Sequence, residues 1–82
     1  MWYVYLLQSI LDKGYYIGYT QNIKERIQEH NAGKTRSIKN RLPMVLIYFE
    51  GYREKTLAIK REYELKHNSF RKRELLDRFI KK

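Results

Sequence analysis

The chain has 82 residues, of which 43% are hydrophobic and 33% charged, and a formal net charge of +9 at pH 7. This length predicts a single small globular domain over residues 1–82, with no room for a second hydrophobic core. The absence of cysteine excludes a disulfide scaffold, a thiolate zinc site and a cysteine nucleophile, and no apolar run is long enough for a membrane-spanning helix.

The first twenty residues predict a β-hairpin. Residues 2–8 and 15–19 are rich in aromatic and β-branched side chains, and residues 9–14 end in Asp-Lys-Gly, which is typical of a turn. Gly18 is unusual inside a strand, where glycine marks a bulge or the close approach of another group. The N-terminus lacks the basic region and small-residue cleavage site of a signal peptide, so we expect a cytoplasmic protein with no membrane partner.

A first helix is expected over residues 22–33. Asn22 is a favourable N-terminal cap, and Gly33 is a left-handed stop. Ile23 and Ile27, one turn apart, predict the buried stripe of this helix. At about 100° per residue, two polar side chains lie at the margin of that stripe, one turn from each other: Arg26 and His30.

The second half of the chain predicts a loop, a strand and two helices. Residues 34–41 are basic and have no apolar pattern, so we expect a loop that Pro43 ends. Residues 44–49 are almost continuously apolar, which suits the centre of a small sheet. Residues 54–67 predict a second helix, and Ser69 is expected to cap a third. Its apolar stripe consists of Leu75, Leu76, Phe79 and Ile80.

Positive charge is concentrated in two stretches of the chain. Residues 21–42 carry a net charge of +4 and residues 57–82 carry +5, whereas residues 1–20 and 43–56 are neutral. Such a surface suits a polyanion, because each neutralised phosphate releases counterions. The alternative is a solvated basic surface that only keeps the protein soluble. Charge alone does not separate DNA from RNA, or an enzyme from a passive binder.

Glu62 stands out on the second helix. A helical wheel places it among four apolar side chains: Leu65, Ala58, Ile59 and Tyr63. A carboxylate in such surroundings costs free energy unless it is paired, protonated or bound to a cation. Two explanations remain open, a salt bridge to one of the arginines and ligation of a metal ion.

Four short motifs occur in order along the chain. Residues 3–5 read YVY, residues 16–18 read YIG, and an arginine and a histidine follow one turn apart at Arg26 and His30. Ala58 and Glu62 then form an Ala-x-x-x-Glu element before Leu-Lys. In this order the motifs resemble the GIY-YIG nuclease family, most closely its short stand-alone bacterial members. One departure is Tyr3, which replaces the first glycine of the family signature.

The resemblance implies an α+β fold, a three-stranded antiparallel sheet flanked by helices in the order β-β-α-β-α-α. It also implies that Glu62 anchors one divalent cation, Mg²⁺ or Mn²⁺, and that Arg26 contacts the scissile phosphate. The general base is one of three residues that the sequence does not distinguish: Tyr5, Tyr16 and His30. Gly18 is then the place where a phosphate or a side chain approaches the backbone. A phosphate-tracking loop is expected from Lys34, Arg36, Lys39 and Arg41.

Three hypotheses of function follow. The first is a metal-dependent endonuclease that hydrolyses DNA phosphodiester bonds in DNA repair or recombination. It would act on branched or non-specific duplex DNA, with a protein partner supplying targeting, because the chain has no room for a sequence-reading domain. The second is a non-catalytic DNA- or RNA-binding module on the same scaffold. The third is a small adaptor that docks another protein through its aromatic hairpin. Retention of every polar position of the motifs favours the first.

Overall fold

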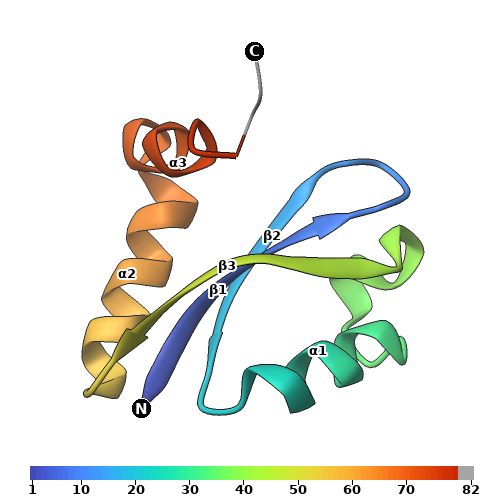
Figure 1. Ribbon diagram of the computed structural model, residues 1–82, viewed down its shortest axis with the longest axis horizontal. Coiled ribbons are helices and arrows are strands. Elements are labelled where there is room, and N and C mark those ends of the chain that lie inside the picture. Colours follow the sequence, from blue (N-terminus) through green and yellow to red (C-terminus); the bar gives the residue numbers. More distant parts are fainter. Residues whose placement is uncertain (80–82) are drawn as a thin grey trace.

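The computed structural model describes residues 1–79 and confirms the predicted α+β architecture (Figure 1). The elements follow the order β-β-α-β-α-α, with a short 3-10 helix, η1, before the third strand. Their bounds are β1 (Trp2–Ser9), β2 (Tyr15–Thr20), α1 (Ile23–Asn31), η1 (Arg36–Arg41), β3 (Met44–Tyr52), α2 (Lys55–His67) and α3 (Ser69–Leu76). Among residues 1–79, no helix is long and apolar enough to span a membrane.

The sheet has three antiparallel strands in the order β2-β1-β3. The prediction that residues 44–49 form the central strand is therefore wrong, because β1 occupies the centre and β3 an edge. Residues 4–7 of β1 are all buried, whereas Leu46 and Phe49 of β3 are 37% and 51% exposed. Both strands carry a nearly continuous apolar run, so such a run does not by itself identify the central strand.

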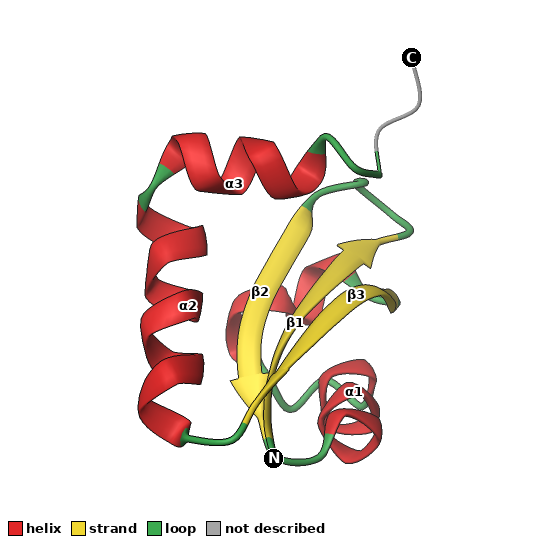
Figure 2. Ribbon diagram, turned by 60° about the vertical axis from the view of Figure 1, so that its left-hand side comes forward, coloured by secondary structure: helices red, strands yellow, loops and turns green. Residues whose placement is uncertain are grey.

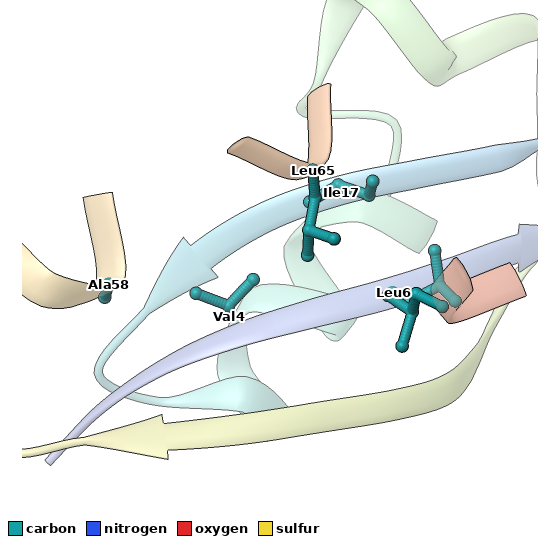
Figure 3. Close-up of a cluster of buried hydrophobic side chains, with 6 residues drawn as sticks. Val4, Leu6, Ile17, Ala58 and Leu65 are labelled. Atoms are coloured by element: carbon teal, nitrogen blue, oxygen red, sulfur yellow. The ribbon is translucent and has the colours of Figure 1, made fainter. Parts of the chain in front are cut away.

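Helices cover both faces of the sheet, and alternate residues of β1 face each side. Figure 2 shows α2 and α3 on one side of the sheet and α1 on the other. The core under α2 and α3 consists of Val4, Leu6, Ile17, Ala58, Leu65 and Leu75. Figure 3 shows part of it, where side chains of β1 and β2 meet those of α2. The core under α1 and η1 consists of Tyr5, Leu7, Ile38 and Met44.

The two expected caps of α1 are present. The side chain of Asn22 accepts a hydrogen bond from the backbone N–H of Glu25 at 3.0 Å, and Gly33 has a φ of +81° just beyond the helix. The predicted buried stripe is weaker than expected, since Ile23 and Ile27 are only half-buried. They line an open groove beside the edge strand β3.

Residues 34–41 are not a simple loop. Most of the segment is the 3-10 helix η1, and its one apolar side chain, Ile38, is 1% exposed in the core beside Tyr5 and Met44. A single anchoring residue produces no periodic pattern, so the sequence does not predict it.

Asn68, and not the predicted Ser69, caps α3. Its side chain accepts a hydrogen bond from the backbone N–H of Arg71 at 3.1 Å, while Ser69 is the first helical residue. Asn68 is also the C-cap of α2, so a single extended residue makes the sharp corner between the two helices that Figure 2 shows. Leu75 of the predicted α3 stripe is buried, and Ile80 lies outside the described residues.

The buried face of α2 is narrower than the helical wheel predicted. Ala58 and Leu65 are buried as expected, but Ile59 and Tyr63 are 39% and 65% exposed. The helix packs on the sheet through one line of small and branched side chains, and the flanks of that line are polar.

A partly buried carboxylate network fastens α2 to β3. Glu50 accepts hydrogen bonds from Arg61 at 2.9 and 3.1 Å and from the hydroxyls of Tyr48 and Tyr52 at 2.6 Å each. Burial alone raises the pKa of Glu50, but these hydrogen bonds outweigh it and hold that pKa below its ordinary value.

Candidate active site

Tyr5 is the centre of a polar cluster at the β2 side of the sheet. The other members of the cluster are Tyr16, Arg26, His30, Thr35, Glu62 and Lys66. Tyr5 lies on β1, faces α1 and is 2% exposed, and its hydroxyl is hydrogen-bonded to Nε2 of His30 at 2.8 Å. Gly18 is its cross-strand partner on β2, and a Cβ at Gly18 would overlap the Tyr5 hydroxyl oxygen. A glycine within a strand predicted that another group approaches the backbone closely there. That group is the Tyr5 side chain.

His30 lies in the last turn of α1 and is fully buried. Its Nε2 meets Tyr5, and its Nδ1 is 2.5 Å from the hydroxyl oxygen of Thr35. Burial lowers the pKa of His30, and the nearby charge of Arg26 lowers it further, so the ring is neutral at pH 7. A neutral ring has one donor and one acceptor, and both are used within the protein.

Tyr16 lies on β2, half-buried at the edge of the sheet. Its ring is edge-on to His30, with centroids 5.1 Å apart, and 6.4 Å from the ring of Tyr5. On its other side, the ammonium of Lys66 lies 5.8 Å from the ring centroid. Tyr16 is more accessible than Tyr5, which is 2% exposed.

Arg26 lies one turn before His30, as predicted, with its side chain 38% exposed. Its Nη1 is 3.0 Å from a carboxylate oxygen of Glu29. Burial raises the pKa of Tyr5 to about 12, although Arg26 beside it acts in the opposite direction. At neutral pH Tyr5 is thus a phenol that can donate its proton to a hydrogen bond.

Glu62 reaches the cluster from α2, around the β2 edge of the sheet. Its side chain is 19% exposed, and a carboxylate oxygen lies 3.6 Å from the ammonium of Lys66. The ion pair that the sequence left open is thus made with a lysine and not with an arginine. Glu62 is also close enough to Tyr5 to contribute to its raised pKa, after burial and Tyr16.

The donor set around Glu62 is small. Among residues 1–79, no group of three or more His, Cys, Asp or Glu side chains is arranged to hold a metal ion. A lone carboxylate does not suit a closed structural site, but it does suit Mg²⁺, which keeps several waters and takes further oxygen ligands from phosphates. The residues present therefore fit a hydrated ion that is shared with a substrate.

The predicted phosphate-tracking segment is divided in its contacts. Lys34 precedes η1, and Arg36 and Lys39 lie on it; all three are exposed. Arg41 instead makes an ion pair with Asp12 in the hairpin turn, with Nε 2.8 Å from the carboxylate. Its side chain fastens the end of η1 to the β1–β2 turn.

Tyr3, the departure from the family signature, is accommodated by a glycine on the other edge strand. Its ring packs over Gly51 of β3, where an added Cβ would lie 3.4 Å from the ring, and it is edge-on to Phe49 at a centroid distance of 5.8 Å. The larger side chain thus lies toward β3, away from the Tyr5–Gly18 contact on β2.

Two members of the polar cluster escaped the sequence analysis. Lys66 follows Glu62 by four residues, a spacing that favours ion pairs on a helix and was an available signal. Thr35 binds His30 across the turn after α1, a contact with no periodic signal.

Comparison with known proteins identifies relatives of this chain. The model of the GIY-YIG catalytic domain matches residues 1–74. A UPF0213 protein of Staphylococcus haemolyticus is 46% identical over 65 residues, which are 78% of each chain. A UPF0213 protein of Natronomonas pharaonis is 40% identical over 75 residues, 90% of this chain and 87% of its own.

A solved structure is similar as well. The solution NMR structure of a UPF0213 protein from Bacillus halodurans has 38% sequence identity and a TM-score of 0.56, and it covers 93% of this chain and 82% of its own. The family match takes in the whole polar cluster, from Tyr5 on β1 to Glu62 on α2. The chain therefore belongs to the GIY-YIG nuclease family, as one of its small stand-alone UPF0213 members.

Proposed function

We propose that the protein is a metal-dependent endonuclease that hydrolyses DNA phosphodiester bonds and selects its DNA by shape, in DNA repair or recombination. The observation that carries the proposal is the convergence of two tyrosines, a buried histidine and a carboxylate from β1, β2, α1 and α2. A module that only bound nucleic acid would need surface cations, but not a buried tyrosine–histidine pair beside a carboxylate.

In this proposal, Tyr16 contacts the attacking water. Tyr5 and His30 are 2% and 0% exposed, so water reaches neither of them readily, whereas Tyr16 is half-buried at the sheet edge. Tyr5 and His30 are then positioning residues that hold the Tyr16 ring from behind.

Arg26 would bind the scissile phosphate. Its ion pair with Glu29 is a half-exposed surface pair, and such pairs contribute little. The guanidinium is therefore free to turn toward a phosphate, which it can hold through two oxygens at once.

Glu62 would hold the divalent cation, Mg²⁺ or Mn²⁺, with waters and phosphate oxygens as the other ligands. When bound, the ion supplies positive charge for the phosphate and for the leaving oxygen. Lys66 must release the Glu62 carboxylate for this, and at 3.6 Å their contact is a loose one.

Exposed cations would bind the phosphate backbone on both sides of the cluster, without reading bases. On one side they are Lys34, Arg36 and Lys39, and on the other they are Arg71, Lys72 and Arg73 of α3. Phosphate contacts position a protein on DNA but carry no sequence information, so DNA shape or a protein partner would direct cleavage.

A cleavage assay tests the proposal. Labelled duplex, flap, four-way-junction and single-stranded DNA are each incubated in Mg²⁺, Mn²⁺ or EDTA with wild type, Glu62→Ala and Glu74→Ala. Glu74 is an exposed α3 glutamate in an ion pair with Arg71 and serves as the matched control. We expect metal-dependent cutting that Glu62→Ala abolishes and Glu74→Ala retains.

Two tyrosine variants in the same assay separate the proposed roles. Tyr16→Phe should lower the cleavage rate at least as much as Tyr5→Phe, with DNA affinity and Tm close to wild type. Tight, salt-sensitive binding by wild type without cutting would instead support the non-catalytic module. Cutting that survives Glu62→Ala unchanged would refute Glu62 as the metal ligand.

A further inference from the structure

The outward face of α2 carries an aromatic pair that the polar cluster does not use. Tyr63 is 65% exposed, and its ring lies against that of His67 one turn later, with centroids 4.2 Å apart and planes inclined by 32°. Helix surfaces exposed to water usually carry charged side chains, so two aromatic rings in contact there are unusual. No contact with the core explains it, since the buried line of α2 runs through Ala58 and Leu65 on its opposite side.

The rings border a shallow hollow of about 420 Å³. It is lined by Lys60, Tyr63, Glu64, His67 and Asn68. The carboxylate of Glu64 is bound by Arg61, and Lys60 makes no ion pair within residues 1–79, so its ammonium gives the rim a positive charge. The hollow thus combines stacked rings with a positive edge.

This combination suits a nucleobase more than a protein side chain. Every base presents a π-face that can stack on an aromatic ring, and the phosphate next to it needs a cation nearby. A protein partner would need a wider apolar surface, but the rest of the lining is polar or charged: Lys60, Glu64 and Asn68.

The aromatic pair lies next to the polar cluster on the same helix. Tyr63 directly follows Glu62, and His67 directly follows Lys66, so each ring is about 100° around the helix from a cluster residue. A DNA strand whose phosphate reached Glu62 would pass over or beside this face. A base that left the duplex there would meet the rings first.

We propose that Tyr63 and His67 form a stacking platform for an unpaired base next to the cleavage site. The platform rests on the proposed function, because it takes its ligand class from DNA bound at Glu62. With this platform, the protein would bind DNA that has a single-stranded segment, such as a flap, more tightly than an uninterrupted duplex. Because stacking tolerates all four bases, the platform adds structure selection without sequence selection.

Fluorescence anisotropy in EDTA tests the platform without cleavage. A labelled flap and a blunt duplex of the same sequence are titrated with the full chain as wild type, Tyr63→Ala, His67→Ala and Tyr63→Phe. Phe70→Ala is the matched control, because Phe70 is 69% exposed but outside the hollow. We expect about tenfold weaker flap binding for Tyr63→Ala, near-wild-type binding for Tyr63→Phe and Phe70→Ala, and duplex binding unchanged by any of them.

The platform is refuted if Tyr63→Ala binds the flap as wild type does, or loses affinity for flap and duplex equally. The first result would mean that the two rings do not bind a DNA base. The second would mean that Tyr63 contributes to binding of the DNA backbone in general. Neither result depends on catalysis, so a protein that never cuts DNA counts against the proposed function and not against the platform. Melting curves check that each variant is folded.

Discussion

The contact between Gly18 and Tyr5 predicts a large effect of one methyl group. In Gly18→Ala, the new Cβ would lie 2.6 Å from Cζ of Tyr5 and overlap its hydroxyl oxygen. Tyr5 is 2% exposed, and its hydroxyl is held by a fully buried His30, so the ring has no free space to enter. The ring must shift, and its hydrogen bond to Nε2 is broken or stretched.

Two costs add up in this variant. Overpacking a buried site costs about 1–3 kcal/mol, and leaving a buried polar atom without its hydrogen bond costs about 1–3 kcal/mol. Their sum, about 2–6 kcal/mol, corresponds to a fall in Tm of at least about 8 °C for a domain of this size. Thermal melts and urea unfolding measure it. Gly51→Ala is the control, because its Cβ would meet the flexible end of Met1 and costs little.

A double-mutant cycle tests the steric contact between Tyr5 and Gly18 directly. Tyr5→Leu removes the ring, so Tyr5→Leu with Gly18→Ala should be less destabilised than the sum of the two single variants, by about 1–3 kcal/mol. If Gly18→Ala melts within about 2 °C of wild type, or if the two changes are additive, the steric argument is wrong.

The other predictions concern ion pairs. Because the pKa of Glu50 is lowered by folding, its contribution to stability is full above its ordinary value of 4.5 and is lost as the pH falls through the lower folded-state pKa. Glu50→Gln should therefore flatten the dependence of Tm on pH between about pH 5 and pH 3, and an unchanged slope would contradict this. Arg41→Ala should lower Tm, through loss of the Asp12 pair, without changing DNA affinity. Lys39→Ala should instead leave Tm unchanged, weaken DNA binding and reduce the slope of log Kd against log salt by about one. Equal slopes for the two variants would mean that Arg41 also binds phosphate.

The local patterns of the sequence predicted the elements of the fold well. The hairpin, the Asn22 cap and the Gly33 stop depend on neighbours in sequence, and all are present. The sheet order was harder, because β1 and β3 have similar apolar runs and only pairing distinguishes the central strand. The cap of α3 was misassigned by one residue, since both Asn68 and Ser69 are good capping residues.

The sequence motifs proposed the members of the candidate site but not their contacts. The structure brings the five proposed side chains near one another, and their catalytic roles stay predictions: Tyr5, Tyr16, Arg26, His30 and Glu62. Which tyrosine reaches water depends on the packing of Tyr5 over Gly18, a contact between two strands. Contacts of this kind, between residues far apart in the sequence, are not predicted by the pattern of neighbouring residues.

The corner between α2 and α3 limits where the chain tolerates changes in length. Asn68 ends one helix and begins the next, so no residue between them can absorb an insertion. One added residue would turn α3 by about 100° about its axis. Leu75, now 2% exposed in the core, would then leave it, and a charged neighbour would take its place. The β1–β2 turn, where residues 10–13 are exposed, has no such restriction. At the corner, the number of residues is therefore as strongly constrained as the identity of a core side chain.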